Sequence, residues 1–127
     1  GTLVTITDWD KDPDGLLNIM TTGQQCFRVL SYAANADKLL IGDVELLPVE
    51  PPLKLDPEFA PLAEKLERLL EQLESYVKYP EKKLEDAVWV SNRLIELLPL
   101  QDRDKMILLQ MQCANDRLRI LQQITFE

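Results

Sequence analysis

Hydrophobic and polar residues alternate along the first 47 residues of this chain, in four runs separated by turn residues. The runs are residues 2–7, 16–22, 26–32 and 39–47. Asp14-Gly15 separates the first two, and glycine supplies the positive φ that a tight hairpin turn needs. Gly23 ends the second run, and the polar residues 35–38 separate the last two. The pattern predicts four consecutive antiparallel strands, a β meander.

The alternation also predicts which side chains share a face, because successive side chains of a strand point to opposite sides. Phe27 and Val29 fall on one face of the third run. In the fourth run Leu40, Val44 and Leu46 share a face and leave Asp43 and Glu45 on the other. One apolar and one polar face are typical of an antiparallel sheet with a single buried side.

Residues 47–57 carry four of the eight prolines and separate this β part from an α part. Asp56 is a suitable N-cap, followed by Pro57 and Glu58 in the first helical turn. The pattern predicts a long helix that ends at Tyr79-Pro80. Its apolar stripe consists of Phe59, Leu62, Ala63, Leu66, Leu69, Leu70, Leu73, Tyr76 and Val77. That stripe fits either packing within the domain or a coiled-coil seam for a partner.

A second helix is predicted from residue 81 to residue 98, before Pro99. Its main face consists of Leu84, Ala87, Val88, Ser91, Leu94, Ile95 and Leu98. Trp89, Val90 and Leu97 lie off that face, so each is either core or part of a contact patch. Asp102 and Asn115 are suitable caps for two shorter helices.

The predicted architecture is α+β, with an antiparallel β meander followed by a helical bundle of three to four helices. We expect a β subdomain at residues 1–47, a proline-rich linker at 48–57 and a helical subdomain at 58–127. A chain of 127 residues is long enough to bury a core.

Charge and composition narrow the classes of partner. Net charge is −8, and both halves are acidic, with seven acids against three bases in residues 1–47. Nucleic-acid binding relies on cations that neutralise phosphates, so this balance disfavours it. No apolar run approaches the ~20 residues that a membrane helix needs. Cys26 and Cys113 are far apart and are expected to be small buried side chains, which fits a reducing cytoplasm.

The sequence contains no recognisable catalytic motif. It has no histidine and no glycine-rich phosphate loop, and its three serines lie in no motif, so we expect a protein that is not an enzyme and uses no cofactor. Residues 10–15 have the acid spacing of the start of an EF-hand calcium loop. The twelfth position is Thr21 instead of glutamate, and a strand enters the loop, so a solvated acidic turn is expected and no metal site.

A spaced series of motifs resembles a known family. It consists of GTLV at 1–4, DGLL at 14–17, GQQCFRVL at 23–30 and LLIGDVELLP at 39–48. This series is similar to the N-terminal substrate-binding domain of Lon proteases. With DAVWVSNRLIELLPL at 86–100, the chain resembles short bacterial proteins that consist of a Lon N-terminal-like domain alone.

The resemblance implies that the meander is part of a PUA-like β-barrel and that the domain holds unfolded or tagged polypeptides without ATPase or peptidase activity. The chain departs from the family at Cys26, where arginine is common. The family domain also has roughly sixty residues before the position of Gly1, so the chain is expected to be a fragment.

Polypeptide binding without catalysis is therefore the expected function. Candidate contacts are Trp89, Val90, Leu97, Phe27 and Arg28, together with an exposed sheet edge that could also pair with a second copy. The alternative is a structural oligomerisation module that uses the long amphipathic helix. RNA binding, which a PUA-like fold would also allow, is disfavoured by the acidity.

Overall fold

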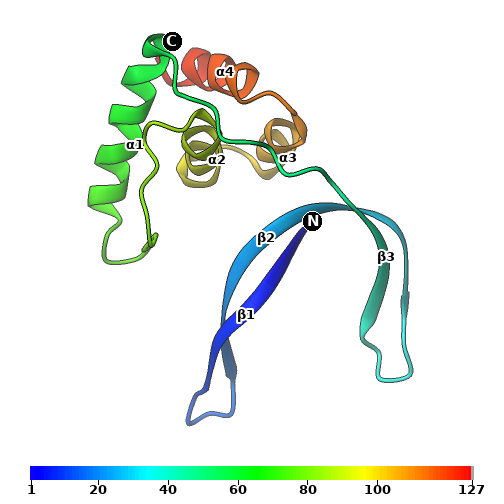
Figure 1. Cartoon of the computed structure of the whole chain (residues 1–127). Coiled ribbons are helices and arrows are strands. Elements are labelled where there is room, and N and C mark those ends of the chain that lie inside the picture. Colours follow the sequence, from blue (N-terminus) through cyan, green and yellow to red (C-terminus); the bar gives the residue numbers. More distant parts are fainter. Residues whose placement is uncertain (127) are drawn as a thin grey trace. The chain divides into compact units, whose positions relative to one another are not determined.

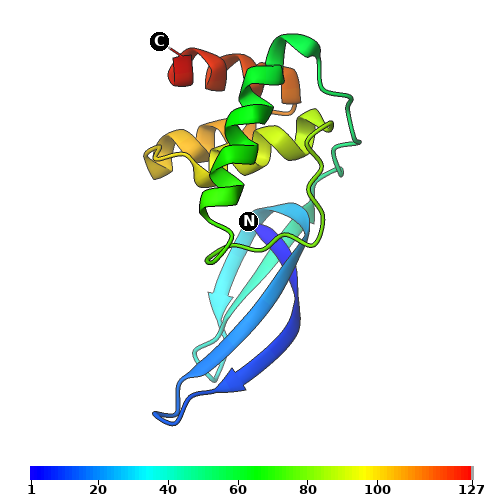
Figure 2. The same ribbon diagram turned by 90° about the vertical axis from the view of Figure 1, so that its left-hand side faces the viewer.

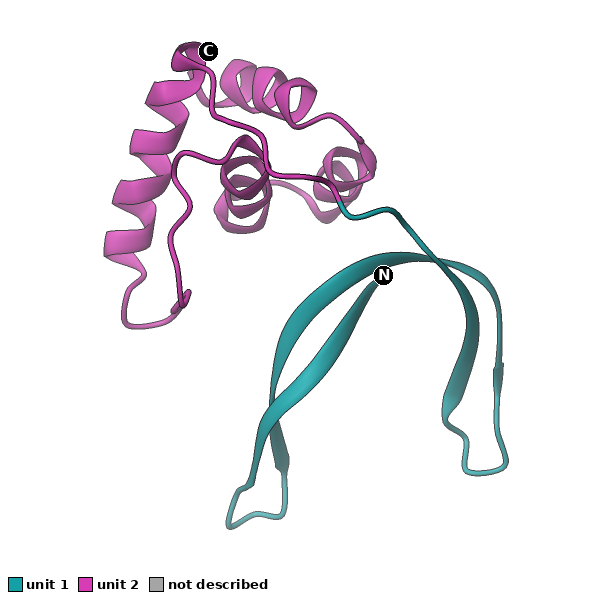
Figure 3. Cartoon of the chain, in the orientation of Figure 1, with its two compact units in different colours: residues 1–49 teal, residues 50–127 magenta. Residues whose placement is uncertain are grey.

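The computed structural model describes residues 1–126. They form two compact units, one from Gly1 to Val49 and one that begins at Glu50. Figure 3 colours these units separately. The first holds a three-stranded sheet and the second holds the helices. The α+β class and the order of sheet before helices are as predicted.

The sheet unit contains strands β1 (Thr2–Lys11), β2 (Leu17–Ala34) and β3 (Leu40–Leu46) in the order β1-β2-β3. Both pairings are antiparallel. The first half of β2 pairs with β1, from Leu17 to Cys26, and the second half pairs with β3, from Phe27 to Ala34. Figure 1 shows β2 as one curved ribbon with a hairpin at each half.

The turns follow the predicted chemistry. Gly15 has a φ of 85°, and its N–H donates to the carbonyl of Asp12 across 2.8 Å. At the second turn, the Asn35 side chain accepts hydrogen bonds from the N–H groups of Asp37 (2.9 Å) and Leu39 (3.0 Å). The predicted turns at Asp14-Gly15 and at residues 35–38 are therefore confirmed.

The prediction of four strands is wrong, because the second and third runs form the single strand β2. Gly23 does not end a strand; it pairs with Val4, next to a register shift in the ladder. A bulge accommodates an extra residue and bends a strand without ending it, and glycine is well tolerated there. The prediction of buried cysteines is also wrong, because both thiols are exposed.

The helical unit comprises η1 (Pro57–Phe59), α1 (Ala60–Gln72), α2 (Ala87–Leu97), α3 (Asp102–Gln110) and α4 (Ala114–Phe126). Helix α2 contacts α1, α3 and α4. In Figure 2 the green α1 crosses the yellow-green α2. The hydrophobic core consists of Phe59, Leu62, Leu66, Leu70, Ala87, Val90, Leu94, Ile95, Leu98, Leu108, Ala114, Leu118 and Leu121.

Two predicted helices are longer than the observed ones. The first ends at Gln72, not at Tyr79, because residues 73–76 form a turn and Tyr76 is 85% exposed, so a longer helix would gain no packing. The second begins at Ala87, not at residue 81. Before it, the N–H of Leu55 donates to the carbonyl of Glu85, and the N–H of Ala87 donates to that of Leu53. This extended pairing occupies backbone N–H and C=O groups that a longer helix would need for its own hydrogen bonds.

Asp86 fixes both the start of α2 and the linker beside it. One carboxylate oxygen, Oδ1, accepts from the N–H of Val88 (2.9 Å) and from the N–H of Leu53 (3.2 Å). The first contact is an N-cap, and the second holds the segment that leads from the sheet unit into η1.

We expect Asp86→Ala to lower the free energy of unfolding of the helical unit by about 1–2 kcal/mol, because it removes a cap and a linker contact together. Urea unfolding followed by circular dichroism at the helical band measures this. Asp56→Ala is the matched control, since Asp56 caps only the three-residue η1 through the N–H of Glu58. Equal losses in the two variants would contradict the double role of Asp86.

Candidate functional site

The second hairpin has one apolar and one polar face, and its register defines them. Phe27 pairs with Leu46, and Val29 pairs with Val44. Cross-strand partners lie side by side on one face. A register shift between Val29 and Ser31 places Tyr32 opposite Gly42. Gly42 and Leu40 alternate with Val44 along β3, so Tyr32 and Leu40 lie on this face too. We call these six residues the β2–β3 apolar face: Phe27, Val29, Tyr32, Leu40, Val44 and Leu46.

The opposite face of this hairpin carries charged and polar groups together with the apolar pair Ala33–Ile41. Arg28 pairs with Glu45 in the ladder, and their side chains form an ion pair at 3.8 Å. The Ser31 hydroxyl donates to a carboxylate oxygen of Asp43 across 3.2 Å. The predicted placement of Phe27 and Val29 on one face, and of Leu40, Val44 and Leu46 on the face opposite to Asp43 and Glu45, is therefore confirmed.

The β2–β3 apolar face is uncovered, contrary to the predicted burial of one side. Tyr32 is 72% exposed and Leu40 is 66% exposed, and only Phe27 is half-buried. No residue of 1–49 is buried. Alternation in the sequence correctly shows which side chains share a face, but it cannot show whether anything packs on that face.

The edges of the sheet unit are open as well. Each half of β2 pairs with one strand only, β1 or β3, and those two strands have no other partner among residues 1–126. An unpaired edge carries N–H and C=O groups that can pair with an added strand. The unit thus combines uncovered apolar side chains with free backbone groups.

The five residues predicted as contacts do not form one surface. Phe27 and Arg28 are neighbours on β2 and point to opposite faces. Val90 is fully buried in the helical core, which leaves it no surface for a ligand. Trp89 and Leu97 are half-buried and pack against that core.

Trp89 belongs to an aromatic cluster with Tyr79 and Arg93. The two rings meet edge to face, with centroids 5.8 Å apart, and the Arg93 guanidinium lies 5.2 Å from the centroid of Tyr79. Burial raises the pKa of Tyr79 above its ordinary 10.0, and the nearby Glu96 carboxylate adds to this. A cleft of about 320 Å³ beside it is lined by Leu70, Glu74, Val77, Lys78, Tyr79 and Lys82.

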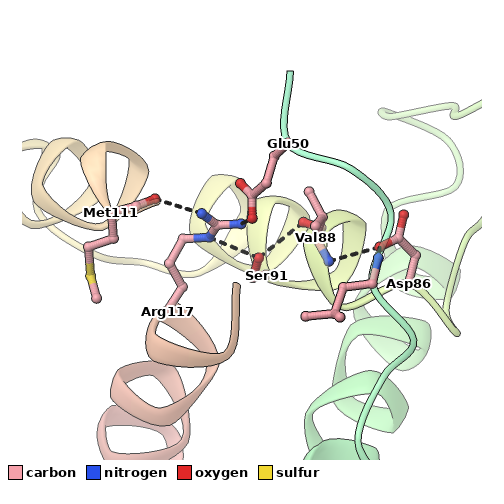
Figure 4. A network of polar contacts seen from close by, with 7 residues as sticks. Glu50, Asp86, Val88, Ser91, Met111 and Arg117 are labelled. Carbon is pink, nitrogen blue, oxygen red and sulfur yellow. Dashed lines mark hydrogen bonds and ion pairs between the residues drawn. The ribbon is translucent and has the colours of Figure 1, made fainter. Parts of the chain in front are cut away.

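A buried polar network joins the start of the helical unit to α2 and α4 (Figure 4). The guanidinium of Arg117 donates to the Ser91 hydroxyl (3.0 Å), the Met111 carbonyl (2.7 Å) and a carboxylate oxygen of Glu50 (2.8 Å). Arg117 is 1% exposed. No pattern in the sequence predicts this network, because Glu50 and Arg117 are 67 residues apart. Its contacts are internal, so it supports the fold and offers no ligand site.

Residues 10–15, which have the acid spacing of the start of a calcium loop, lie at the end of β1 and in the turn that follows it. A strand enters it, as expected from the sequence. Among residues 1–126 no cluster of three or more acidic, histidine or cysteine side chains could hold a metal ion. None of the helices in that range is long and apolar enough to cross a membrane.

Comparison with models of known protein families shows to which family the chain belongs. The family model for the substrate-binding domain of the ATP-dependent protease La (Lon) matches residues 1–125. The chain belongs to the Lon substrate-binding domain family. No curated protein matches the chain.

Solved structures of Lon N-terminal domains have the same fold. The Lon N-terminal domain protein from Xanthomonas campestris is 34% identical, with a TM-score of 0.75 over 94% of this chain. The match spans 64% of that protein, which is less than two thirds of its length. The N-terminal domain of the Mycobacterium avium complex Lon protease is 19% identical, with a TM-score of 0.60 over 97% of this chain and 67% of that one. At that identity the second likeness concerns the fold alone.

Proposed function

We propose that this chain binds unfolded segments of polypeptide, without catalysing a reaction on them, and that its sheet unit is the binding surface. The observation that carries the proposal is the uncovered β2–β3 apolar face, next to open strand edges. Membership of a substrate-binding family supports it.

Unfolded segments fit this surface better than folded proteins do. An extended chain has free backbone N–H and C=O groups that can pair with an open edge, and its alternate side chains can pack on the apolar face. In a folded protein most of these backbone groups are already hydrogen-bonded, and the apolar side chains are already buried. A sheet without a buried face is also stabilised by any polypeptide that covers it.

The test is fluorescence anisotropy with a labelled unfolded protein and its folded counterpart, titrated with the chain. We expect binding of the unfolded form only. Tyr32→Ser and Leu40→Ser should weaken it, because both side chains lie on the β2–β3 apolar face. Glu45→Ser is the matched control, since it changes the polar face of the same hairpin. Equal binding of folded and unfolded forms, or no binding, would overturn the proposal.

A second copy of the chain is one polypeptide that these edges could accept, and we propose that such self-association competes with binding. Light scattering coupled to size exclusion measures the mass at tens of micromolar. A dimer that dissociates as unfolded polypeptide is added supports the competition. A monomer at all concentrations removes self-pairing and leaves polypeptide binding unaffected.

The alternative, an oligomerisation module built on α1, would need the apolar stripe of α1 to be exposed to a partner. Leu62, Leu66 and Leu70 of α1 are buried within the helical unit. A coiled-coil seam needs such positions to face a partner.

A further inference from the structure

The first hairpin carries a second uncovered surface, centred on Trp9 near the end of β1. Trp9 is 68% exposed and pairs with Ile19 on one face of the hairpin. On the other face Asp8 pairs with Met20, and Asp10 pairs with Asn18. These six residues line a shallow cleft of about 150 Å³, which we call the Trp9 surface.

Negative charge surrounds Trp9. Asp8, Asp10, Asp12 and Asp14 lie within seven residues of chain that contain one base, Lys11. The hydrogen bonds of Asp8 and Asp10 are local, from the N–H groups of Trp9 and Lys11 (both 2.8 Å). None of the four aspartates forms an ion pair with any residue in the range 1–126. Their charge is therefore free to act on a partner.

Charge and exposed apolar area alternate here as a strand requires. Trp9 and Ile19 share one face, while Asp8 and Asp10 lie on the other together with the exposed Met20. The outer edge of β1 is unpaired among the described residues, and so is the edge of residues 17–25 of β2 that faces away from β1. A strand added at either edge would send alternate side chains to the apolar and to the acidic face.

We propose that the Trp9 surface binds extended polypeptide segments in which apolar residues alternate with lysine or arginine. The apolar side chains pack beside Trp9 and Ile19, and the cationic ones lie beside Asp8 and Asp10. This rests on the proposed function and adds the class of sequence that is preferred. The net acidity of the sheet unit attracts such segments before contact.

The experiment compares labelled peptides of equal length by anisotropy: alternating valine and lysine, alternating valine and glutamate, and valine and lysine in separate blocks. At low salt we expect the alternating lysine peptide to bind roughly 10-fold more tightly than the glutamate peptide, an advantage that salt reduces. The blocked peptide should bind more weakly than the alternating one, because it cannot match the two faces.

Variants test whether the preference for the lysine peptide depends on the Trp9 surface. Asp8→Asn with Asp10→Asn should lower affinity for the lysine peptide alone, whereas Trp9→Ser should lower it for both alternating peptides. Asp37→Asn is the control, because it removes one negative charge at the turn of the other hairpin. A loss with Asp37→Asn as large as that with the double variant would overturn the assignment to the Trp9 surface.

The two proposals fail in different ways. Equal affinity for lysine and glutamate peptides, with the unfolded protein still bound, overturns the sequence preference and leaves the proposed function standing. If neither the peptides nor the unfolded protein bind, both proposals fall.

Discussion

Glu50→Ala is expected to lower the free energy of unfolding of the helical unit by about 2–3 kcal/mol, because it leaves the buried Arg117 cation without its counter-charge. The side chain of Arg117 is 2% exposed, so it depends on protein groups for most of its hydrogen bonds. Two neutral acceptors, the Ser91 hydroxyl and the Met111 carbonyl, remain and keep the loss below that of an isolated buried charge.

Removing the cation instead has a smaller cost. The side chain of Glu50 is 28% exposed and can turn toward water when Arg117 is absent. Ser91 still donates to the carbonyl of Val88 at 3.0 Å, so its hydroxyl keeps a partner. Arg117→Met retains much of the volume, and we expect a loss of about 1–2 kcal/mol, mainly from the unpaired Met111 carbonyl.

The double variant separates these effects. Glu50→Ala with Arg117→Met should be about as stable as Arg117→Met alone, so the second substitution rescues the first. Urea unfolding at the helical band measures all three variants. Asp116→Ala is the control, since its ion pair with Arg119 is exposed and should contribute less than about 1 kcal/mol. Additive losses in the double variant would show that Glu50 and Arg117 act independently.

Local chemistry explains which parts of the fold the sequence predicts. Asp14-Gly15 predicts the first hairpin because the turn depends on a backbone conformation that glycine adopts at no cost. Asp56 and Pro57 predict the start of η1 for the same kind of reason. Each of these signals lies within a few residues and needs no distant partner.

The predictions of element boundaries fail where the structure of a segment depends on residues far away in the sequence. The start of α2 depends on pairing of residues 53–55 with residues 85–87, which periodicity cannot reveal. The single strand β2 depends on β1 and β3 pairing with its two halves. Val90 lies off the main stripe of α2, so the sequence left it open between core and contact patch. It is buried because α2 contacts helices on more than one side. A helix with several neighbours needs more than one apolar face.

Leu66→Asp is expected to unfold the helical unit. Leu66 is 0% exposed and lies one helical turn from both Leu62 and Leu70, which are also buried. The substitution removes a buried leucine side chain and places a carboxylate among apolar groups, at a combined cost of roughly 5 kcal/mol or more. That is comparable with the whole stability of a domain of this size.

Circular dichroism and light scattering, measured on the same sample, distinguish unfolding of the helical unit from the loss of an oligomer. We expect loss of most of the helical signal, because α1 packs against α2 and the core is shared. Arg68→Asp is the matched control, since it places the same side chain on the exposed side of α1 and should keep the signal. A full helical signal in Leu66→Asp together with a lower mass would instead mean that the apolar stripe of α1 joins two copies of the chain. A charge at an interface between copies separates them and leaves each copy folded, whereas a charge in the core unfolds the unit.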